Sequence, residues 1–481
     1  TESYGGFANL NRRLTPQISA FAQFTYGRSK QHTTLPPFGL APQNLAGFTL
    51  PASNPYNPLG ISLTDTNTSA LGFTFLSALR RADADTRTAT ALAGLRGTAR
   101  DIWHWESAVS YGVNDATQIT DAIDPVALQA ALNGTTRATA YNPFGPAEDA
   151  SLLRRLFVPY RGRDGRTDAF GYDATVNGSF YQLPWRGAGQ LGVAVGYEFR
   201  RESLRFDPET TPAFLLGTAI PFSGHRQLHS FYAEFSVPVQ KWLELHLAGR
   251  HERYSDFGET TKPKVGVKVR LPANRFVNVL VRGSYSESFK APDLGQLYQT
   301  QTSASAGNQR DPLRPQDGVR LLTAILGGNR SLQPEEGKVQ YVGVVFEVPA
   351  IKGLSLSADY FDIAIRGAIF TRSAAFILSP EGQRLFPDAI IRDNSVQNPG
   401  PITFLNTTSA NLGYQLYRGW DFGLKYATRP TRFGRFAFNA DVTQTLVRGR
   451  AVGLGGGFVD STGKYFAPVW RSNLGLNWRH K

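Results

Sequence analysis

The sequence predicts an all-β fold, a transmembrane antiparallel β-barrel, from three observations. First, apolar and polar residues alternate along about fifteen segments, which is typical of strands with one apolar and one polar face. Second, these segments run to about 12 to 18 residues, whereas strands of soluble sandwiches usually have about 5 to 6 and a bilayer takes roughly 9 to 11. Third, short turns alternate with long loops along the whole chain, as in barrels that span a membrane.

The alternation locates each strand. We expect strands at 5–14, 18–33, 78–97, 101–115, 166–181, 189–205, 224–238, 242–255, 260–271, 276–290, 337–348, 354–370, 414–428, 434–448 and 464–480. Three neighbouring strands show the two faces best, with an apolar phase at Leu243, Leu245, Leu247, Val265, Val267, Val269, Val277, Val279 and Val281 and a polar phase at Glu244, His246, Lys264, Lys268, Arg270, Asn278 and Arg282. We expect the apolar phase to face lipid and the polar phase to face the lumen.

Composition favours a barrel over a bundle of membrane helices. Hydrophobic residues make up 41% of the chain, and no apolar run approaches the roughly 18 residues of a membrane helix. A spanning protein without such helices must close its sheet, because lipid cannot satisfy the backbone groups of an open edge. The chain contains no cysteine, which excludes disulfides and thiol-based sites.

Turn lengths and tryptophans predict the orientation. Short connections are expected near 15–17, 98–100, 182–188, 239–241, 272–275, 349–353 and 429–433, and by the barrel convention these face the periplasm. Indole rings favour the membrane interface, and five of the seven tryptophans fall at those ends: Trp103, Trp105, Trp185, Trp242 and Trp478. Trp420 and Trp470 do not follow this pattern.

The strand directions predict an incomplete barrel. Both the first and the fifteenth strand run toward the short-turn end, so joining them would need a parallel seam, whereas bacterial barrels have even strand numbers. Missing strands explain this arrangement most simply. We therefore expect that about 15 strands of a 22-stranded barrel are present, since barrels with a plugged lumen can have 22 strands. The chain has no methionine and starts at Thr1 in barrel-like sequence. We interpret residues 1–481 as one incomplete barrel domain.

Seven stretches, in order, resemble the barrel of TonB-dependent outer-membrane receptors. They are YNPFG at 141–145, GYEFRRES at 196–203, GRHERYSDFGETTKPKVGVKVR at 249–270, VNVLVRGSYSESFKAPDLGQLY at 277–298, LQPEEGKVQYVGVVFEVP at 332–349, GLSLSADYFDIAIRGAI at 353–369 and RGWDFGLKY at 418–426. No single stretch is decisive, but the ordered set covers nearly the whole chain.

The resemblance implies a receptor and transporter in the outer membrane of a Gram-negative bacterium. It would bind a scarce ligand on its extracellular loops and import it with energy supplied by TonB. The family's amino-terminal plug domain, with the segment that TonB grips, is absent from this chain. The ligand stays open among siderophore-like chelates, cobalamin-like chelates, oligosaccharides and peptides. Membrane lipid and lipopolysaccharide are the expected surroundings, and we expect a monomer.

A second class of function remains open: a passive porin, or a barrel-borne surface protein such as an adhesin. A plug with a TonB-binding segment upstream would establish the receptor, whereas a bare barrel start would favour the alternative.

The long loops are the candidates for ligand capture, with surface shielding and lipopolysaccharide contact as the alternative. They are expected near 34–77, 116–165, 206–223, 291–336, 371–413 and 449–463. Within them we expect short apolar or helical pieces at Pro125–Leu132 and Ser373–Leu378 and a mobile tip at Gln299–Gln309.

The meaning of the net charge of +13 depends on where its cations lie in the fold. We interpret Lys264, Lys268, Arg270 and Arg282 as parts of a solvated wall or as partners of acidic plug residues, with an anionic ligand as the alternative. Loop 291–336 is nearly balanced, since Arg310, Arg314, Arg320 and Arg330 oppose Asp293, Asp311, Asp317, Glu335 and Glu336. No compact basic and aromatic module predicts nucleic-acid binding.

The sequence predicts no enzyme and no cofactor, since it has no G-x-S-x-G, H-E-x-x-H or Walker motif. We interpret the glycine-rich run 452–458 as flexible loop. His246 and His251 are five apart, so strand geometry sends them to opposite faces. Two pairs of side chains with oxygen ligands, Asp83 with Asp85 and Asp65 with Asn67, lack the glycine and terminal glutamate of a calcium loop. We assign no catalytic, cofactor-binding or metal residue, and the ligand-binding residues stay unknown.

Overall fold

One large antiparallel sheet dominates the computed structural model, which describes residues 1–36, 39–40, 48–64, 73–74, 79–145, 150–209, 220–273, 275–452 and 457–480. Its long strands are β1 (Glu2–Arg13), β2 (Ile18–Leu35), β5 (Arg80–Ala99), β6 (Trp103–Ile123), β7 (Phe157–Gln182), β8 (Gln190–Phe206), β9 (Phe222–Gln240), β10 (Leu243–Tyr254), β11 (Gly258–Arg270), β12 (Asn278–Lys290), β15 (Glu335–Glu347), β16 (Leu354–Thr371), β19 (Ser409–Ala427), β20 (Arg435–Val452) and β22 (Trp470–Arg479). A short strand, β21 (Val459–Asp460), also pairs with β20. In this part of the chain no helix is long and apolar enough to cross a membrane.

The fifteen expected strands are all present and follow the expected order, so the all-β prediction is confirmed. Several boundaries were wrong. Strands β6 and β7 pair well into the region expected to be loop, where for example Thr117 lies opposite Asp164, so that loop spans only 124–156. Polar residues such as Thr117, Gln118 and Asp164 interrupt the apolar phase in this extension, so the alternation does not signal it. The last strand begins only at Trp470 rather than at 464.

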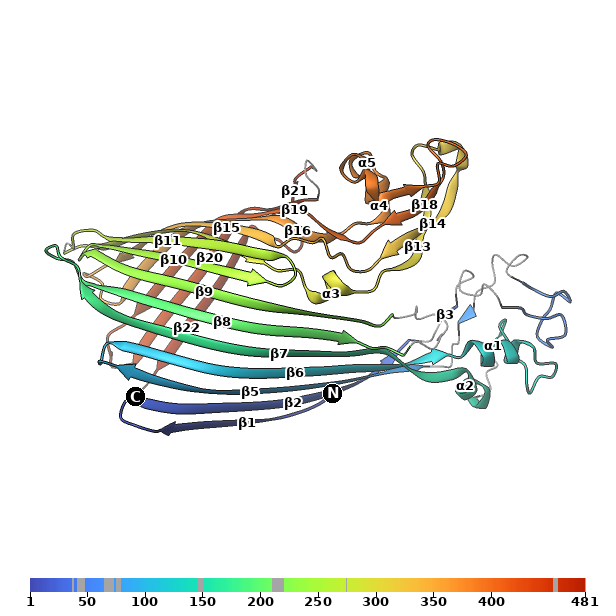
Figure 1. Cartoon of the computed structure of the whole chain (residues 1–481), viewed down its shortest axis with the longest axis horizontal. Helices are drawn as coiled ribbons and strands as arrows, with labels where there is room; N and C mark the ends of the chain where they lie inside the picture. Colours follow the sequence, from blue (N-terminus) through green and yellow to red (C-terminus); the bar gives the residue numbers. More distant parts are fainter. Residues whose placement is uncertain are drawn as a thin grey trace.

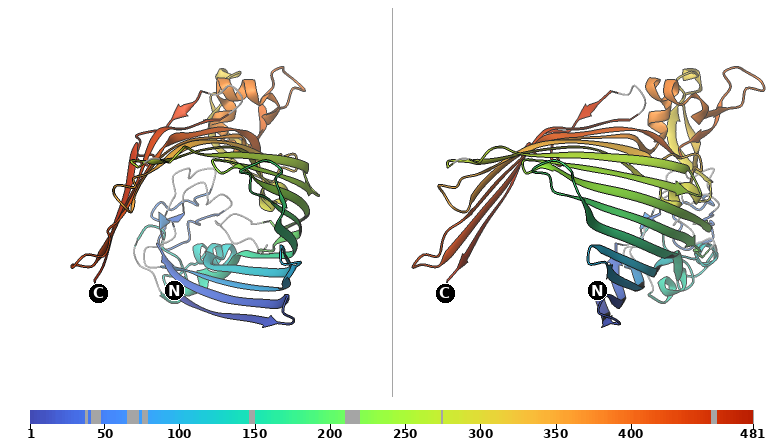
Figure 2. Two further views of the ribbon diagram at one scale, coloured as in Figure 1. Left: turned by 90° about the vertical axis from the view of Figure 1, so that its left-hand side faces the viewer. Right: turned by 60° about the vertical axis from the view of Figure 1, so that its left-hand side comes forward.

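The sheet curves into a wall around an opening, with the two chain ends at separate edges (Figure 1, Figure 2). The edge strands are β1 and β22, and no pairing joins them among the described residues. Both run toward the short-turn end, as the sequence predicts. A total of 22 strands in the whole barrel stays a prediction.

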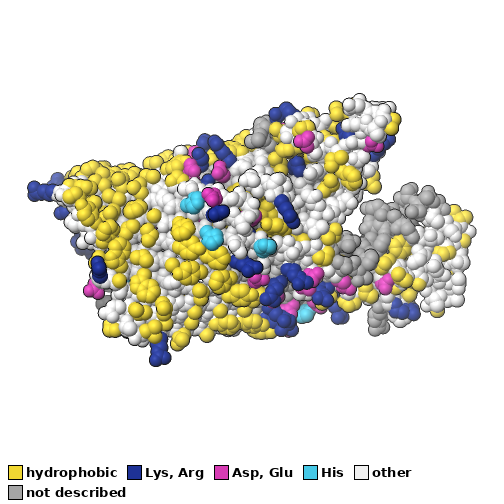
Figure 3. Space-filling model, in the orientation of Figure 1, with side chains coloured by type: hydrophobic (Ala, Val, Ile, Leu, Met, Phe, Trp, Pro, Cys, Tyr) yellow, Lys and Arg dark blue, Asp and Glu magenta, His cyan; other side chains and the backbone are white. Residues whose placement is uncertain are grey.

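The strand register keeps the two faces separate. On β10 and β11, Leu245 lies opposite Val267, and Glu244 lies opposite Lys268. Arg282 of β12 continues the polar row beyond Lys268. Because like phases pair with like, the convex face is apolar and the concave face is polar. On the face seen in Figure 3, hydrophobic side chains cover the short-turn half, and charged and histidine side chains gather nearer the long loops.

The convex face changes chemistry in a fixed order from the short turns toward the loops. Along β8 the outward side chains are Val193, Val195, Tyr197, Phe199 and Arg201. Aliphatic, aromatic and charged groups thus succeed one another, as expected where a wall leaves the hydrocarbon, crosses the headgroups and enters water.

Tryptophans mark both interfaces. At the short turns, Trp103 stacks on Phe180 with ring centroids 5.3 Å apart, and Trp478 stacks on Phe436 at 6.1 Å. The other three expected there, Trp105, Trp185 and Trp242, also lie at that end. Trp420 lies on the convex face of β19 between Phe422 and Arg418, and contacts Tyr360 at 5.3 Å. It therefore belongs to the opposite aromatic band, and the register places Trp470 in the same row through Gln444.

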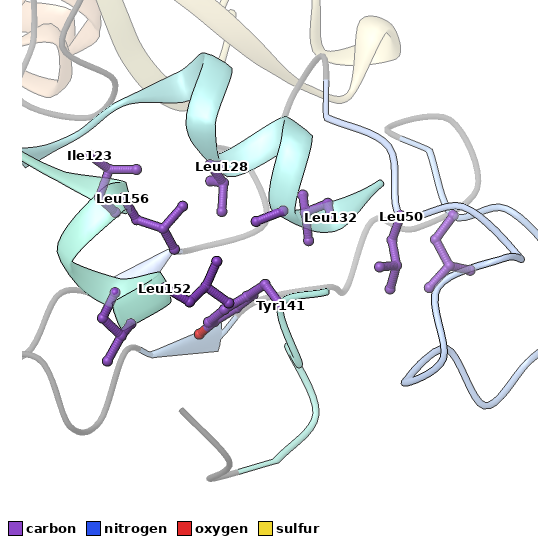
Figure 4. Close-up of a cluster of buried hydrophobic side chains, with 10 residues drawn as sticks. Leu50, Ile123, Leu128, Leu132, Tyr141, Leu152 and Leu156 are labelled. Carbon is purple, nitrogen blue, oxygen red and sulfur yellow. The ribbon is translucent and has the colours of Figure 1, made fainter. Parts of the chain in front are cut away.

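Two long loops share a small hydrophobic core at the outer end of the wall, which we term the first loop module (Figure 4). It comprises residues 48–64 and helices α1 (Pro125–Leu132) and α2 (Ala150–Leu156). Asp124 caps α1 by accepting hydrogen bonds from the amides of Val126 and Ala127 at 2.8 and 3.1 Å. Its buried core comprises Leu50, Leu63, Ile123, Leu128, Ala131, Leu132, Tyr141, Leu152, Leu153 and Leu156. The helix expected at Pro125–Leu132 is confirmed.

Two other loops build the second loop module around a four-stranded sheet. Its elements are β13 (Thr302–Arg310), η2 (Pro315–Asp317), β14 (Val319–Leu326), α4 (Ala374–Leu378), α5 (Pro380–Leu385), η3 (Pro387–Ala389), β17 (Ile390–Arg392) and β18 (Ile402–Asn406). Leu322, Ile377, Leu378, Ala389 and Leu405 form its core. Helix α4, capped by Ser373, confirms the second expected piece. The mobile tip expected at Gln299–Gln309 was wrong, because most of it is β13, which pairs with the apolar strand β14.

The remaining elements are short. Helix α3 (Leu294–Tyr298) follows β12, and β3 (Gly39–Leu40) pairs with β4 (Phe73–Thr74).

We expect Val267→Arg to destabilise the wall by about 2 to 4 kcal/mol if the site lies near the bilayer midplane, because a guanidinium would enter hydrocarbon. Urea unfolding of the full-length protein in lipid vesicles, followed by tryptophan fluorescence, measures this cost.

Lys268→Gln is the matched control one residue away. It loses a contact of 3.5 Å to Glu244 but keeps a polar group on the concave face, so we expect a cost below about 1 kcal/mol. Equal costs at the two positions would contradict the assignment of faces.

Candidate functional site

The concave face is hollowed by two adjoining cavities. The first has a volume of about 850 Å³ and is lined by Lys264, Lys268, Arg282 and Tyr341, among others. The second, of about 660 Å³, lies nearer the loops and shares Lys264 with the first. The lumen-facing position of Lys264, Lys268 and Arg282 is thereby confirmed.

A carboxylate organises the cations at the short-turn end. Glu244 lies 3.5 Å from Lys268 Nζ, 3.9 Å from Arg270 and 2.6 Å from His246 Nε2. Lys268 Nζ is also 3.1 Å from that histidine nitrogen. These groups come from adjacent strands in one row, so the register itself brings opposite charges together.

Arg282 and Asp359 pair across a strand that lies between them. In register, Arg282 neighbours Gly343, which neighbours Asp359. Because Gly343 has no side chain, the guanidinium reaches over it to Asp359, at 2.9 Å from Oδ2 and 3.1 Å from Oδ1. Tyr341 donates a second hydrogen bond to Asp359 and presents its ring 5.4 Å from Arg282.

A second network lies toward the loops on β8, β9 and β10. Arg250 binds Glu198 at 2.6 Å and also pairs with the buried Glu252. Arg226 binds Glu202 at 2.7 Å and lies 3.9 Å from Asp256. The wall therefore carries alternating charges that satisfy one another.

Only one of the four concave cations singled out in the sequence has no ion pair among the described residues, and it is Lys264. Glu234 lies two strands away in the same row, separated from it by Ala248. The wall thus supplies its own acidic partners for Lys268, Arg270 and Arg282. Sequence reasoning placed the cations and Glu244 on the polar face, but it found neither their pairing nor the role of Asp359, since pairing requires the register.

Aromatic rings gather where the concave face meets the loops. Tyr254 stacks on Phe257 at 4.4 Å, and Phe289 meets the two rings at 5.9 and 6.3 Å. Arg226 lies 5.5 Å from the Tyr254 ring. We term Tyr254, Phe257 and Phe289 the mouth cluster. Its combination of flat apolar rings and a cation can hold planar or aromatic groups.

Ion pairs also tie the second loop module together. Arg392 binds Asp311 at 2.5 and 2.8 Å, with side chains only 9% and 10% exposed. Burial opposes ionisation of Asp311, but hydrogen bonds from Arg392 and from the Leu313 amide hold its pKa below the ordinary value. Arg314 pairs with Asp317 at 2.8 Å. The charges of loop 291–336 are therefore not all paired within that loop, since Asp311 pairs with Arg392 of the other loop.

The remaining sequence candidates fall in different places. His246 lies on the concave face beside Glu244, whereas His251 bonds Thr261 on the other face, so their separation is confirmed. Asp85 and Asp83 pair with Arg28 and His32. Asp65 and Asn67 and most of the glycine run lie outside the described residues. Within the described ranges, no three His, Cys, Asp or Glu residues group as metal ligands.

A family model described as TonB dependent receptor-like, beta-barrel, matches residues 13–481. The chain belongs to the TonB-dependent receptor family. No curated protein matches it in sequence. None of the described residues forms a separate plug domain.

Solved structures share the fold at low sequence identity. The siderophore receptor PirA from Acinetobacter baumannii aligns with a TM-score of 0.58 and 13% identity, covering all of this chain and 56% of its own. A variant of the ferric enterobactin receptor from Pseudomonas aeruginosa gives 0.57 and 14%, with 100% and 55% covered. The RagAB peptide transporter gives 0.54 and 11%, with 94% and 47% covered. This chain therefore spans about half the length of these relatives.

We expect Gly343→Ala to destabilise the wall by about 1 to 3 kcal/mol, because a Cβ there would overlap Oδ1 of Asp359 and break its bonds to Arg282. Urea unfolding in lipid vesicles measures the change. Gly266→Ala on the same face is the control, since its nearest neighbour would be His246 Cβ at an ordinary 3.6 Å. Similar costs for the two alanines would refute this role of Gly343.

The Asp311 contact predicts acid sensitivity of the second loop module. Since the folded pKa is depressed, the contact contributes fully above the ordinary aspartate pKa of about 3.9 and is lost as pH falls through the lower folded value. Hydrogen exchange, corrected for its intrinsic pH dependence, should show 390–405 opening below about pH 4. In Asp311→Asn this segment should already be less protected at neutral pH, and an unchanged profile would contradict the assignment.

Proposed function

We propose that this chain forms most of the wall of an outer-membrane receptor that binds a scarce ligand at its outer end and imports it with energy from TonB. The family match over residues 13–481 carries this proposal. Two features support it: a wall with a polar concave face, and loops built into ordered modules at one end.

A wall this wide needs a plug. An unobstructed lumen of that size would pass solutes of many kinds. Import of one scarce ligand therefore requires a domain that blocks the lumen and moves or rearranges when the ligand is imported. The cavities on the concave face offer such a domain space and hydrogen-bonding side chains. Lys264 and Glu234 have no ion pair among the described residues and are therefore among the charges that an inserted domain could use.

Ligand capture is proposed at the mouth cluster and the two loop modules. The concave charges are mostly paired within the wall, so they give no reason to prefer an anionic ligand. The solved relatives include a siderophore receptor and a peptide transporter. Siderophore-like chelates, cobalamin-like chelates, oligosaccharides and peptides all stay candidates.

Other properties are proposed with this function. The protein would act as a monomeric transporter and not as an enzyme, without a resident cofactor and without nucleic acid as a partner. Above the aromatic band on the convex face, Arg201 and neighbouring cations would meet phosphates of lipopolysaccharide. The competing proposal is a passive porin or surface protein, and the two differ in their need for energy.

Uptake measurements test the proposal. In a strain that lacks the gene, restoring the full-length protein should restore saturable uptake of one member of a panel of labelled ferric chelates, cobalamin, oligosaccharides and peptides. Dissipating the proton gradient or deleting TonB should abolish this uptake. Unsaturable uptake that persists without the gradient would support the porin instead.

A pair of phenylalanines refines the test. Phe289→Ala removes a ring of the mouth cluster, whereas Phe231→Ala removes a ring that is 58% exposed on the convex face. We expect only the first to raise the ligand concentration needed for half-maximal uptake, by about tenfold if one ring contact is lost. Equal effects would exclude the mouth cluster as a binding site.

A further inference from the structure

The short turns concentrate positive charge on one rim of the wall. They lie at 14–17, 100–102, 183–189, 241–242, 271–277, 348–353 and 428–434. Their basic residues, which with Arg13 at the end of β1 we term the basic rim, are Arg100, Arg186, Lys241, Arg275, Lys352, Arg429 and Arg432. Asp101 is the only acidic residue in these turns. Every turn therefore contains or directly follows a cation.

The basic rim is exposed, and within the described residues none of its members forms an ion pair. Arg13 donates hydrogen bonds to the carbonyls of Thr15 and Pro16. Arg275 and Arg432 lie over the neighbouring rings of Phe276 and Phe433, each at 4.6 Å. Toward the other end of the wall, some cations of the strands do have carboxylate partners, such as Arg226 with Glu202 and Arg250 with Glu198.

The aromatic residues place this rim at a defined depth. Trp185 and Trp242 are sequence neighbours of Arg186 and Lys241 within the same turns. Indole rings favour the level of lipid headgroups. Long basic side chains beside them can extend to the same level while their aliphatic stems stay against the wall. The cations therefore lie where phosphates of a bilayer leaflet would be.

We propose that the basic rim binds the phosphates of anionic phospholipids in the leaflet that the short turns face. The cations are spread over all seven turns along the whole width of the wall, which matches a two-dimensional anionic surface. A protein partner would need them gathered on one side. The inference goes beyond transport but rests on the placement of this wall in a membrane under the proposed function.

The test compares two fourfold variants of the full-length protein. The rim variant is Arg100→Gln, Arg186→Gln, Lys241→Gln and Lys352→Gln. The control neutralises four exposed cations at the loop end, for which no ion pair is found among the described residues: Arg137→Gln, Arg163→Gln, Arg310→Gln and Arg384→Gln. Each protein is placed in vesicles of phosphatidylethanolamine and phosphatidylglycerol, extracted gently, and the retained lipids are quantified by mass spectrometry.

We expect the unaltered protein and the control to retain phosphatidylglycerol several-fold above its share in the vesicle, and the rim variant to lose this enrichment. Restoring charge with lysine at the four rim positions should restore it. Equal enrichment in all proteins, or equal loss in both variants, would overturn the proposal. So would a rim variant that keeps its lipid enrichment but loses a co-purifying acidic protein.

Two further outcomes stay interpretable. Heat-dependent gel migration shows whether the rim variant folds. If it does not fold, a salt series on the unaltered protein tests the proposal instead, because lipid enrichment by exposed charges must fall as the salt concentration rises. Enrichment that persists at high salt overturns the proposal. Failure of the unaltered protein to insert into vesicles of any composition would instead overturn the membrane placement itself.

Discussion

The wall depends on one constraint: in lipid, every backbone amide and carbonyl must find its hydrogen-bond partner on a neighbouring strand. This requires long strands in continuous register, such as β5 with β6 and β2 with β5. Since side chains alternate across each strand, a fixed register also fixes which side chains become neighbours. The apolar convex face and the polar concave face are therefore two consequences of the same ladder.

The register explains how a basic chain can have a concave face that is nearly balanced in charge. Glu244 meets Lys268 directly, whereas Arg282 and Asp359 meet only because Gly343 leaves the intervening strand bare. Charges that are paired within the wall in this way are less available to bind a ligand. Selectivity is then expected to reside where the ladder ends, in the loop modules and the mouth cluster.

The fold could be predicted from the sequence because alternation is a local signal that repeats in every strand. The fifteen strands and the placement of five tryptophans required nothing else. Trp420 required knowing that Tyr360 lies beside it, and the strand at Thr302–Arg310 required its partner β14, so both depend on contacts distant in sequence. The ion pairs of the site, such as Asp311 with Arg392 from another loop, are non-local in the same way.

The loop end and the short-turn end of the wall differ in how their connecting segments are ordered. Outer loops of this length would lose much conformational entropy on binding a ligand if they were flexible. The buried clusters around Leu128 and around Ile377 order described parts of these loops beforehand, so less of that cost falls on the binding step. The opposite end needs no such core, because turns of a few residues are already constrained by the strands they join. Exposed cations and indole rings are sufficient there to interact with a lipid surface.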